Sequence, residues 1–416
     1  MMHVIAAILA GTVACAICHG WLIRRLRNHY SRPAAVWPAD RPWPKVAIVL
    51  SLRGKDPFLE MCLRNLLRQD YPDFVLQIVV DSETDPAWEA IHAIQSECDG
   101  ERLKVSVLHD RRASCSLKNS SIIQAINSLP DDRELVAFVD ADAIAHPTWL
   151  RCLVTPLADP EVGCSTGVRW FAPADQSLAT RLRCYWNLFA APVIYHSQIP
   201  WGGSMVVRRS VLDSGLTEEW SRMFCEDAHT INHLQRRGLK LACVPAVTVV
   251  NHETTTVAGC FRFFNRQMLI FRLYHRQWWP LVAMIVFATV LRFTHFYYIL
   301  QSLIYRDWIN CLALICIYAI IPCVTQYEAR HLDAAVRKMV RKTGQEIARN
   351  PAPELFFFFC AEAMSVGSML AAFTARFVNW RGISYRVDGP KNITMLAYRP
   401  FVLTPAAIVA GSESVI

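Results

Sequence analysis

Two aspartates with a single alanine between them stand at the end of a short apolar run. Residues 135–139 are all apolar, which is typical of a strand buried on both faces, and Asp140 and Asp142 follow them. Two carboxylates so close together repel each other, and their removal from water adds to the cost. We therefore expect a cation here, either a divalent metal ion or a basic cluster, unless the pair is simply exposed in a surface turn.

A second acidic position follows another apolar run. Asp81 comes directly after the run 74–80, and Asp85 lies four residues further on, immediately before Pro86. An aspartate in this loop could bind a ligand or cap the helix that is predicted to open at Pro86. Asp85 suits the capping role better than Asp81 does.

Both acidic positions lie in a segment, residues 43–257, in which strand-like and helix-like patterns alternate. Apolar runs predict strands at 45–52, 74–81, 103–109 and 135–142, and helical spacing predicts helices at 57–72, 86–98 and 116–129. Such alternation predicts an α/β fold with a mostly parallel sheet and helices on both of its faces. Because ligands of these sheets bind beyond the carboxyl ends of the strands, we expect Asp81, Asp140 and Asp142 to mark a binding site.

The composition adds a membrane part to this globular part. Of the 416 residues 53% are hydrophobic, and the mean hydropathy is +0.22, which is high for a soluble enzyme. Residues 1–23 are long enough to cross a hydrocarbon core of about 30 Å as a helix. Because Arg24, Arg25 and Arg27 follow this run, we predict a retained transmembrane anchor with the next part of the chain in the cytoplasm.

Further apolar stretches lie near the C-terminus. Residues 278–305 and 308–327 are predicted transmembrane helices, followed by a basic cytoplasmic segment at 328–353. Arg292 and His295 within the first of these helices are expected to face protein or to snorkel.

The last apolar stretch, 354–377, is harder to assign. It has basic residues on both sides and Glu362 near its middle, so a transmembrane helix and a re-entrant or interfacial helix fit equally well. Residues 378–416 are then a C-terminal cytoplasmic tail.

The cysteines indicate the cellular compartment of the protein, and the net charge indicates its binding partners. Several of the 15 cysteines lie in apolar runs, which favours buried free thiols in a reducing cytoplasm over a disulfide framework. The net charge of +8 comes largely from basic runs beside the apolar stretches. Such runs suit the anionic head groups of a lipid bilayer, so we expect no nucleic acid partner.

An ordered set of motifs resembles a known enzyme family. The chain contains SLRGKDPFLEMCLRNLLRQDYP, VVDSETDPAW, SLKNSSI, VDADAIAHPTWL, GGSMVVRRSVL, CEDAHTINHLQRRGLKL and, near its end, NWRGISYRV. In this order they resemble an inverting family 2 glycosyltransferase with a GT-A fold, and more closely its ceramide glucosyltransferase-like branch. They cover most of residues 45–275 together with 379–387.

The resemblance implies a reaction and its partners. A bacterial membrane-lipid hexosyltransferase of this kind would move a sugar from a UDP-sugar donor to a lipid hydroxyl, with Mg²⁺ or Mn²⁺ as cofactor. It would be an integral protein of the bacterial inner membrane, with the catalytic domain in the cytoplasm. We consider a processive polysaccharide synthase less fitting, because two or three C-terminal membrane segments offer little wall for a polymer channel.

On the donor side, the resemblance assigns Asp142 to the metal ion, Asp140 to the sugar or ribose, and Asp81 to the uracil or ribose. Asp85 is a rival for the role of Asp81 because the loop can be aligned in two ways. Lys118 matches a lysine that contacts the donor diphosphate.

On the acceptor side, the resemblance makes Asp227 the base that takes the hydroxyl proton, with Glu226 in support. Two acids at the start of a helix-like run are also what a helix dipole alone favours. The loop 201–205 would lie under the donor sugar and the acceptor, where Gly203 permits close backbone approach; from these residues alone a bare turn is the alternative.

One motif departs from the family pattern. On an amphipathic interfacial segment at 258–277 the family has Q/R-x-x-R-W; here Gln267 fits, but Ile270 replaces the arginine and Phe271 the tryptophan. We expect Arg266 and Arg272 to point to other faces of a helix than position 270 does. The missing charge could come from one or more of Arg262, Arg266, Gln267 and Arg276.

This departure leaves two other functions open. The chain could be a degenerate relative that binds lipid or nucleotide as a membrane scaffold, although the acidic set at 81, 140, 142 and 227 is intact. It could also transfer sugar to a polyprenyl phosphate, which needs no base. The sequence names neither the sugar nor the acceptor, and it offers no physical role for the WRG segment at 380–382.

Overall fold

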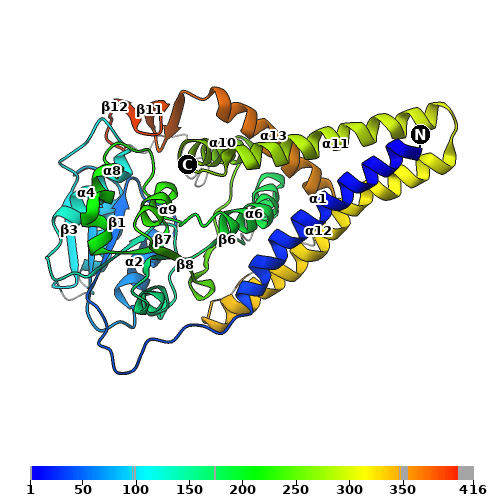
Figure 1. Cartoon of the computed structure of the whole chain (residues 1–416). Helices are drawn as coiled ribbons and strands as arrows, with labels where there is room; N and C mark the ends of the chain where they lie inside the picture. Colours follow the sequence, from blue (N-terminus) through cyan, green and yellow to red (C-terminus); the bar gives the residue numbers. More distant parts are fainter. Residues whose placement is uncertain are drawn as a thin grey trace.

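The computed structural model of the chain describes residues 2–95, 97, 100–172, 175–345, 347 and 355–401. Part of the predicted C-terminal tail, 402–416, lies outside the described residues. Two parts are visible: an α/β domain and a long rod of helices that projects from it (Figure 1). The fold class is thus the one that the alternating pattern predicts.

The main sheet of the described chain has seven strands in the order β3-β2-β1-β4-β7-β5-β8. Strands β3, β2, β1 and β4 run parallel to one another, whereas β7 is antiparallel to both β4 and β5. The seven strands are β1 (Val46–Leu52), β2 (Phe74–Val80), β3 (Leu103–Val107), β4 (Leu135–Val139), β5 (Val162–Thr166), β7 (Ser204–Arg208) and β8 (Lys240–Cys243).

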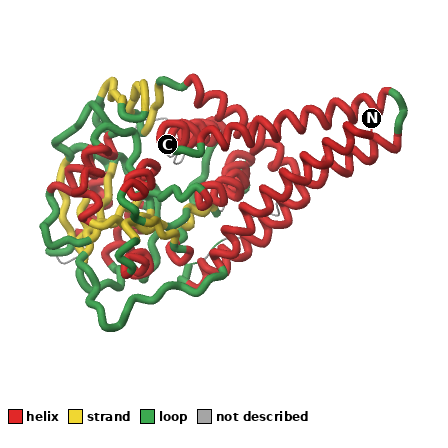
Figure 2. Tube along the Cα trace, viewed as in Figure 1, coloured by secondary structure: helices red, strands yellow, loops and turns green. Residues whose placement is uncertain are grey.

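Helices cover both faces of this sheet, as Figure 2 shows for the whole chain. One face packs against α2 (Leu59–Leu67), α3 (Ala87–Gln95) and α5 (Trp149–Val154), and the other against α4 (Leu117–Asn127), α8 (Thr217–Trp220) and α9 (Asp227–Arg236). Alternate residues of β1 enter the two cores, with Ile48 in one and Val49 in the other. Burial on both faces is the physical reason that these strands are continuous apolar runs.

Smaller elements complete the α/β domain. A two-stranded parallel sheet joins β6 (Arg169–Phe171) to β9 (Val249–Asn251). Short helical turns are α7 (Arg209–Val211), η1 (Thr155–Ala158), η2 (Leu212–Leu216) and η3 (Pro245–Val247).

The C-terminal segment forms a third sheet from β10 (Phe377–Trp380), β11 (Ile383–Gly389) and β12 (Asn392–Ala397). Ile383, Tyr385 and Val387 alternate along β11 into the core that also holds α4 and α9. The described part of the predicted tail is therefore packed onto the α/β domain.

Four helices within the described residues are long and apolar enough to cross a membrane, so the chain is a membrane protein. They are α1 (Met2–Tyr30), α11 (Trp278–Ile304), α12 (Trp308–Lys342) and α13 (Leu355–Thr374). Helices α1, α11 and α12 lie side by side in the rod, with the N-terminus and the α11–α12 turn at its far end (Figures 1 and 2). One helix, α12, continues from the predicted span into the basic segment.

Polar residues within these helices have protein partners. Arg292 of α11 forms an ion pair with Glu362 of α13, and His295 is buried against Thr12 of α1. Both residues face protein, one of the two placements expected for them. Pairing of this kind lowers the cost of charge in an apolar environment.

Two helices connect the rod to the α/β domain. They are α6 (Leu178–His196), whose region carried no sequence prediction, and α10 (Val257–Tyr274) in the predicted interfacial segment. The side chain of Thr256 accepts a hydrogen bond from the Gly259 amide (3.1 Å), which caps the start of α10. Both helices pack against α13, so α6, α10 and α13 form the wall between domain and rod.

Candidate active site

The predicted site residues meet at one end of the main sheet. Asp81 follows β2, Asp140 follows β4, and the Asp227 that opens α9 lies across from them. They line a cavity of about 1050 Å³. The other predicted residues that line it are Asp142, Lys118, Glu226 and Gln267.

Lys118 is the electrostatic centre of this group. It lies in the first turn of α4 because Ser116 caps that helix, its side chain accepting a hydrogen bond from the Asn119 amide (3.1 Å). Its Nζ lies 2.8 Å from Asp140 Oδ1 and 2.6 Å from Glu226 Oε1. A cation at a helix N-terminus opposes the helix dipole, and the two carboxylates offset that effect.

The pKa values of the two acids that contact Lys118 are shifted in opposite directions. Burial opposes ionisation of both. For Asp140, Lys118 and Arg169 outweigh burial and lower the pKa. For Glu226, which is 1% exposed, burial outweighs Lys118, and neighbouring Asp227 adds to it, so its pKa is raised.

Two glycines let the loop before β7 approach these acids. A Cβ at Gly202 would lie well inside van der Waals contact of Glu226, and one at Gly203 would overlap Asp140 and Trp201. Gly203 therefore lies behind the lining of the cavity. The Gly202 amide donates a hydrogen bond to Asp227 Oδ2 (3.2 Å), so this loop contacts both acids of α9.

Asp142 stands in a separate acidic group. The side-chain Nδ2 of Asn251, at the end of β9, donates a hydrogen bond to Asp142 Oδ2 (2.6 Å). Burial, then Glu253 and Asp140, raise the pKa of Asp142 to about 7. Sequence reasoning missed Asn251 and Glu253, because only the pairing of β6 with β9 brings them here.

The described residues contain no group of three or more His, Cys, Asp or Glu side chains that could hold a metal ion by themselves. Mg²⁺ is usually bound through one or two carboxylates together with substrate phosphates and water. Asp142 and its acidic neighbours fit a cation of that kind, because they repel one another without it.

Asp81 forms the opposite end of the polar region. It is 1% exposed and pairs with Arg53, and the Arg111 side chain donates to its backbone carbonyl (2.9 Å). Burial raises the pKa of Asp81 despite Arg53. Its Oδ1 is buried without a hydrogen-bond partner in the described chain, so one acceptor is left for a ligand.

Asp85, the rival of Asp81, is occupied by the backbone. It accepts hydrogen bonds from the Gly54 amide (2.9 and 3.0 Å) and from the Ala87 amide (2.9 Å) at the start of α3. This matches the capping role that suits Asp85 better than Asp81. Between the two, Asp81 is the one that lines the cavity.

The WRG segment has a physical role in this structure. Arg381 donates to both carboxylate oxygens of Asp56 (2.9 and 3.0 Å) and to the backbone carbonyl of Arg53 (2.7 Å). In return, Arg53 Nε donates to the Arg381 carbonyl (2.8 Å). The C-terminal sheet is thereby joined to the loop that follows β1 and orients Arg53 towards Asp81.

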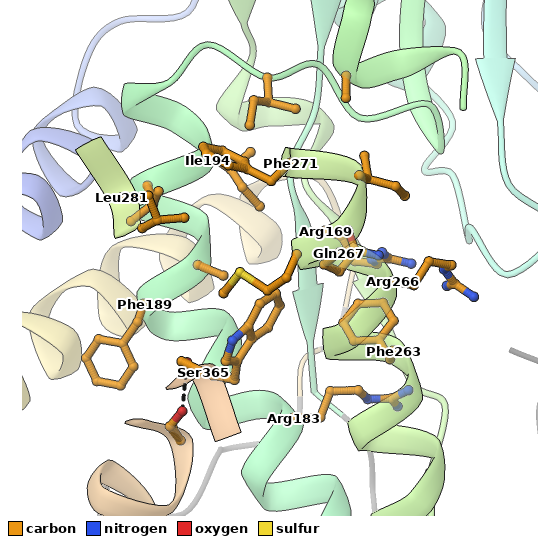
Figure 3. Close-up of a pocket in the computed structure, with 18 of the residues that line it drawn as sticks. Arg169, Arg183, Phe189, Ile194, Phe263, Arg266, Gln267, Phe271, Leu281 and Ser365 are labelled. Carbon is orange, nitrogen blue, oxygen red and sulfur yellow. Dashed lines mark hydrogen bonds between the residues drawn. The ribbon is translucent and has the colours of Figure 1, made fainter. Parts of the chain in front are cut away.

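Our expectation for Arg266 was wrong. Arg266 and Ile270 both line the cavity, because residues four apart share one face of a helix. Figure 3 shows Arg266 beside Gln267 and Arg169. Arg272 does point elsewhere, towards the backbone carbonyls that end α13.

The cavity continues from the charged residues into an apolar region. Its walls there come from α6, α10, α11 and α13, and they include Phe189, Leu281, Phe293 and Leu370. Figure 3 shows the transition, with arginines on one side and Phe189, Ile194 and Leu281 on the other. One cavity thus joins the strand ends to the helices that could cross a membrane.

Comparison with known proteins identifies the family to which the chain belongs. A family model described as glycosyl transferase family 21 matches residues 3–393, so the chain belongs to that family and is a glycosyltransferase. This confirms the resemblance to the ceramide glucosyltransferase-like branch. Among curated proteins, none matches the sequence significantly.

Similarity to a solved mannosyltransferase structure supports the GT-A fold. A mannosyltransferase from Pyrobaculum calidifontis, in complex with GDP-Man and Mn²⁺, is 19% identical with a TM-score of 0.50. The match covers 89% of this chain and 97% of that one. Glucosyl-3-phosphoglycerate synthase from Mycobacterium tuberculosis is 14% identical with a TM-score of 0.37, covering 60% of this chain and 82% of that one.

Proposed function

We propose that this glycosyltransferase moves a sugar from a UDP-sugar to the hydroxyl group of a membrane lipid, with inversion at the sugar carbon. The observation that carries the proposal is the continuity of the cavity. It runs from the acids at the strand ends to an apolar region between α6, α10, α11 and α13. A polar donor and an apolar acceptor would meet where the two regions join.

The donor fits the polar end of the cavity. Asp81 offers a buried acceptor without a partner, which suits an N–H or hydroxyl donor of a nucleoside. Asp140 lies next, held by Lys118, in the position where the sugar or ribose would follow. In this proposal Gln267 lines the cavity beside the sugar.

A divalent ion, Mg²⁺ or Mn²⁺, fits Asp142 and the acids around it. When bound, it would supply positive charge to the diphosphate as the sugar leaves. Asn251 holds Oδ2 of Asp142 through a hydrogen bond, which orients the carboxylate.

Asp227 is the best placed base. Glu226 is held by Lys118, whereas Asp227 receives its hydrogen bonds from the backbone amides of Gly202 and Ala228. Asp227 lines the cavity that also has the apolar region in its wall. In the proposed reaction Asp227 takes the proton of the lipid hydroxyl as that oxygen attacks the sugar carbon.

The proposed orientation puts the catalytic domain in the cytoplasm, in a bacterial inner membrane. Arg24 and Arg27 lie at the domain end of the rod, where both pair with Glu328 (2.5 and 2.7 Å), and Arg25 lies beside them. Basic residues at this end agree with a cytoplasmic location under the positive-inside rule.

The first test is release of nucleoside diphosphate by detergent-purified protein with Mn²⁺, offered a panel of UDP-sugars and GDP-mannose. We expect release from one UDP-sugar that rises with added lipid extract.

Asp142→Ala should lower metal-dependent release about 100-fold or more, because a charge that stabilises the leaving group is lost. Asp227→Asn should lower lipid-dependent transfer by about 10²–10⁴-fold. Asp132→Asn, which changes an exposed surface pair with Lys45, is the matched control.

Other outcomes would correct the proposal. Release from GDP-mannose alone would change the donor. Transfer that survives in Asp227→Asn would favour an acceptor already ionised, such as a polyprenyl phosphate. A polymeric product would exclude the single-transfer reaction. If wild-type protein releases nucleotide from no donor, with or without lipid, the scaffold function is favoured instead.

A further inference from the structure

Two arginines that line the cavity have their guanidinium groups close to aromatic rings. The guanidinium carbon of Arg266 on α10 lies 5.4 Å from the ring centre of Trp380 and 5.8 Å from that of Phe263. The guanidinium carbon of Arg169 on β6 lies 5.4 Å from the same Phe263 ring and 5.2 Å from Trp201. The two side chains thus share one phenyl ring between them.

These arginines differ from the other cations of the site in their charge balance. Lys118 pairs with Asp140 and Glu226, Arg381 with Asp56, and Arg183 with Glu253. Across the described residues, neither Arg169 nor Arg266 has a carboxylate within ion-pair distance. Aromatic faces hold a guanidinium group in place without neutralising its charge. The pair therefore presents positive charge to whatever enters the cavity.

The charges around Arg266 also favour the binding of an anion. Burial, then the nearby Arg169 and Arg381, lower the pKa of Arg266 to about 10. Several cations crowd into a partly buried region, and an anion bound among them would relieve that repulsion. Asp140 and Glu253 raise the pKa of Arg266 by less than burial and the two arginines lower it, so these acids are close to Arg266 without neutralising it in an ion pair.

We infer that Arg266 and Arg169 together bind the diphosphate of the sugar donor and neutralise the charge that develops on it as the sugar leaves. The inference rests on the proposed function. In the reaction, the bond from the sugar carbon to the diphosphate oxygen breaks, and a bond from the lipid oxygen to that carbon forms. The electron pair stays on the diphosphate, which gains negative charge, and the lipid proton goes to Asp227. Guanidinium groups suit such phosphate oxygens because they donate two hydrogen bonds side by side.

This arrangement explains how position 270 can be isoleucine. Ile270 packs against the core that holds α4 and α9, one helical turn after Arg266 on the same face of α10. Moving a cation by four residues displaces it about 6 Å along the helix axis. Trp380 of the WRG segment supports the cation at its new place, and Arg169 comes from a different strand.

The experiment measures binding of UDP, GDP and uridine to detergent-purified protein by calorimetry, with Mn²⁺ and at two salt concentrations. The variants are Arg266→Ala, Arg266→Lys, Arg169→Ala and the double variant Arg266→Ala/Ile270→Arg. Arg262→Ala is the matched control, because Arg262 lies one turn earlier on α10 and is exposed. Melting temperatures show whether each variant is folded.

We expect Arg266→Ala and Arg169→Ala each to weaken UDP binding by about 10- to 100-fold, while uridine binds as in the wild type. Arg266→Lys should lie in between, the double variant should recover part of the affinity, and Arg262→Ala should match the wild type. The salt dependence of UDP binding should fall in the alanine variants. Should both alanine variants be folded and bind UDP like the wild type, the inference is wrong while the proposed function stands. If the wild type binds neither UDP nor GDP, both are wrong.

Discussion

In this site, charged side chains hold and neutralise one another. Lys118 holds two carboxylates that come from different elements, Asp140 after β4 and Glu226 before α9. Without that cation, Glu226 would be a nearly fully buried acid without an opposite charge, which is costly in a protein interior. The same contact fixes where Asp140 points, so one lysine sets both the charge and the geometry of the proposed donor side.

The first residue-scale prediction concerns Gly203. In Gly203→Ala the new methyl group overlaps the Asp140 carboxylate and the Trp201 ring, so one of them must move. Because small displacements of reacting groups are costly in catalysis, we expect sugar transfer to fall about 10- to 100-fold. Steady-state kinetics with the donor that the nucleotide-release assay identifies would measure it. Gly100→Ala is the control, since a Cβ there meets no atom within 4 Å. Wild-type turnover in Gly203→Ala would show that the close approach is unnecessary.

At the scale of elements, α9 is held in place by an acid on the short helix α8. Glu219 accepts hydrogen bonds from His233 (3.2 Å) and Arg236 (2.5 Å) of α9 and is also hydrogen-bonded to His229. Burial opposes its charge, but the bonds from His233 and Arg236 prevail and lower the pKa of Glu219 to about 2. Since α9 opens with Asp227, this contact positions the proposed base.

The element-scale prediction follows from that pKa. A carboxylate with a lowered folded pKa stabilises the folded state above its ordinary value of 4.5, and the effect is lost as pH falls towards 2. We expect Glu219→Gln to lower the melting temperature at neutral pH by about 2–4 °C. The difference from wild type should shrink as pH falls from about 5 to 3, measured by thermal unfolding.

The neighbouring Glu218 provides the control for this prediction. Its side chain is 68% exposed and, among the described residues, its ion pair is with Arg222 one turn away, so Glu218→Gln should melt like the wild type at every pH. A Glu219→Gln difference that stays constant between pH 5 and 3 would mean that packing, and not charge, holds α9.

On the scale of the whole molecule, the chain joins a membrane rod to a nucleotide-sugar fold, and one cavity crosses the junction. The rod depends on contacts between segments far apart in sequence. At its base Glu328 of α12 is 2% exposed and pairs with Arg24 and Arg27 of α1. The first and fourth quarters of the sequence are thereby held together next to the domain.

The whole-molecule prediction concerns this ionic contact. Glu328→Ala leaves two arginines without their shared carboxylate, and we expect a loss of about 3 kcal/mol in stability. Because the contact is remote from the acids of the cavity, the protein that remains folded should keep its kcat. Thermal inactivation in detergent, with Lys338→Ala on the same helix as an exposed control, would measure it. Equal half-lives for Glu328→Ala and wild type would show that apolar packing alone holds the rod.

Much of the polar end of the cavity, the proposed donor half of the site, could be predicted from the sequence. Asp81 and the Asp140–Asp142 pair follow apolar runs, and parallel strands bring such ends to one edge of a sheet. Arg169, Asn251 and Glu253 could not be predicted in this way, because they enter the site through the pairing of two three-residue strands. Arg266 was misplaced, although its spacing of four from Ile270 was already a readable signal of a shared face.

The sequence by itself determined the α/β class, the apolar helices and the acids of the polar end, because these depend on local periodicity and on the order of motifs. Only the tertiary structure decided that the polar and apolar regions share one cavity, that the WRG segment orients Arg53, and that Arg169 meets Arg266 across a phenyl ring. Those contacts join residues separated by scores to hundreds of positions. Their formation depends on how whole elements pack, and no local pattern records that.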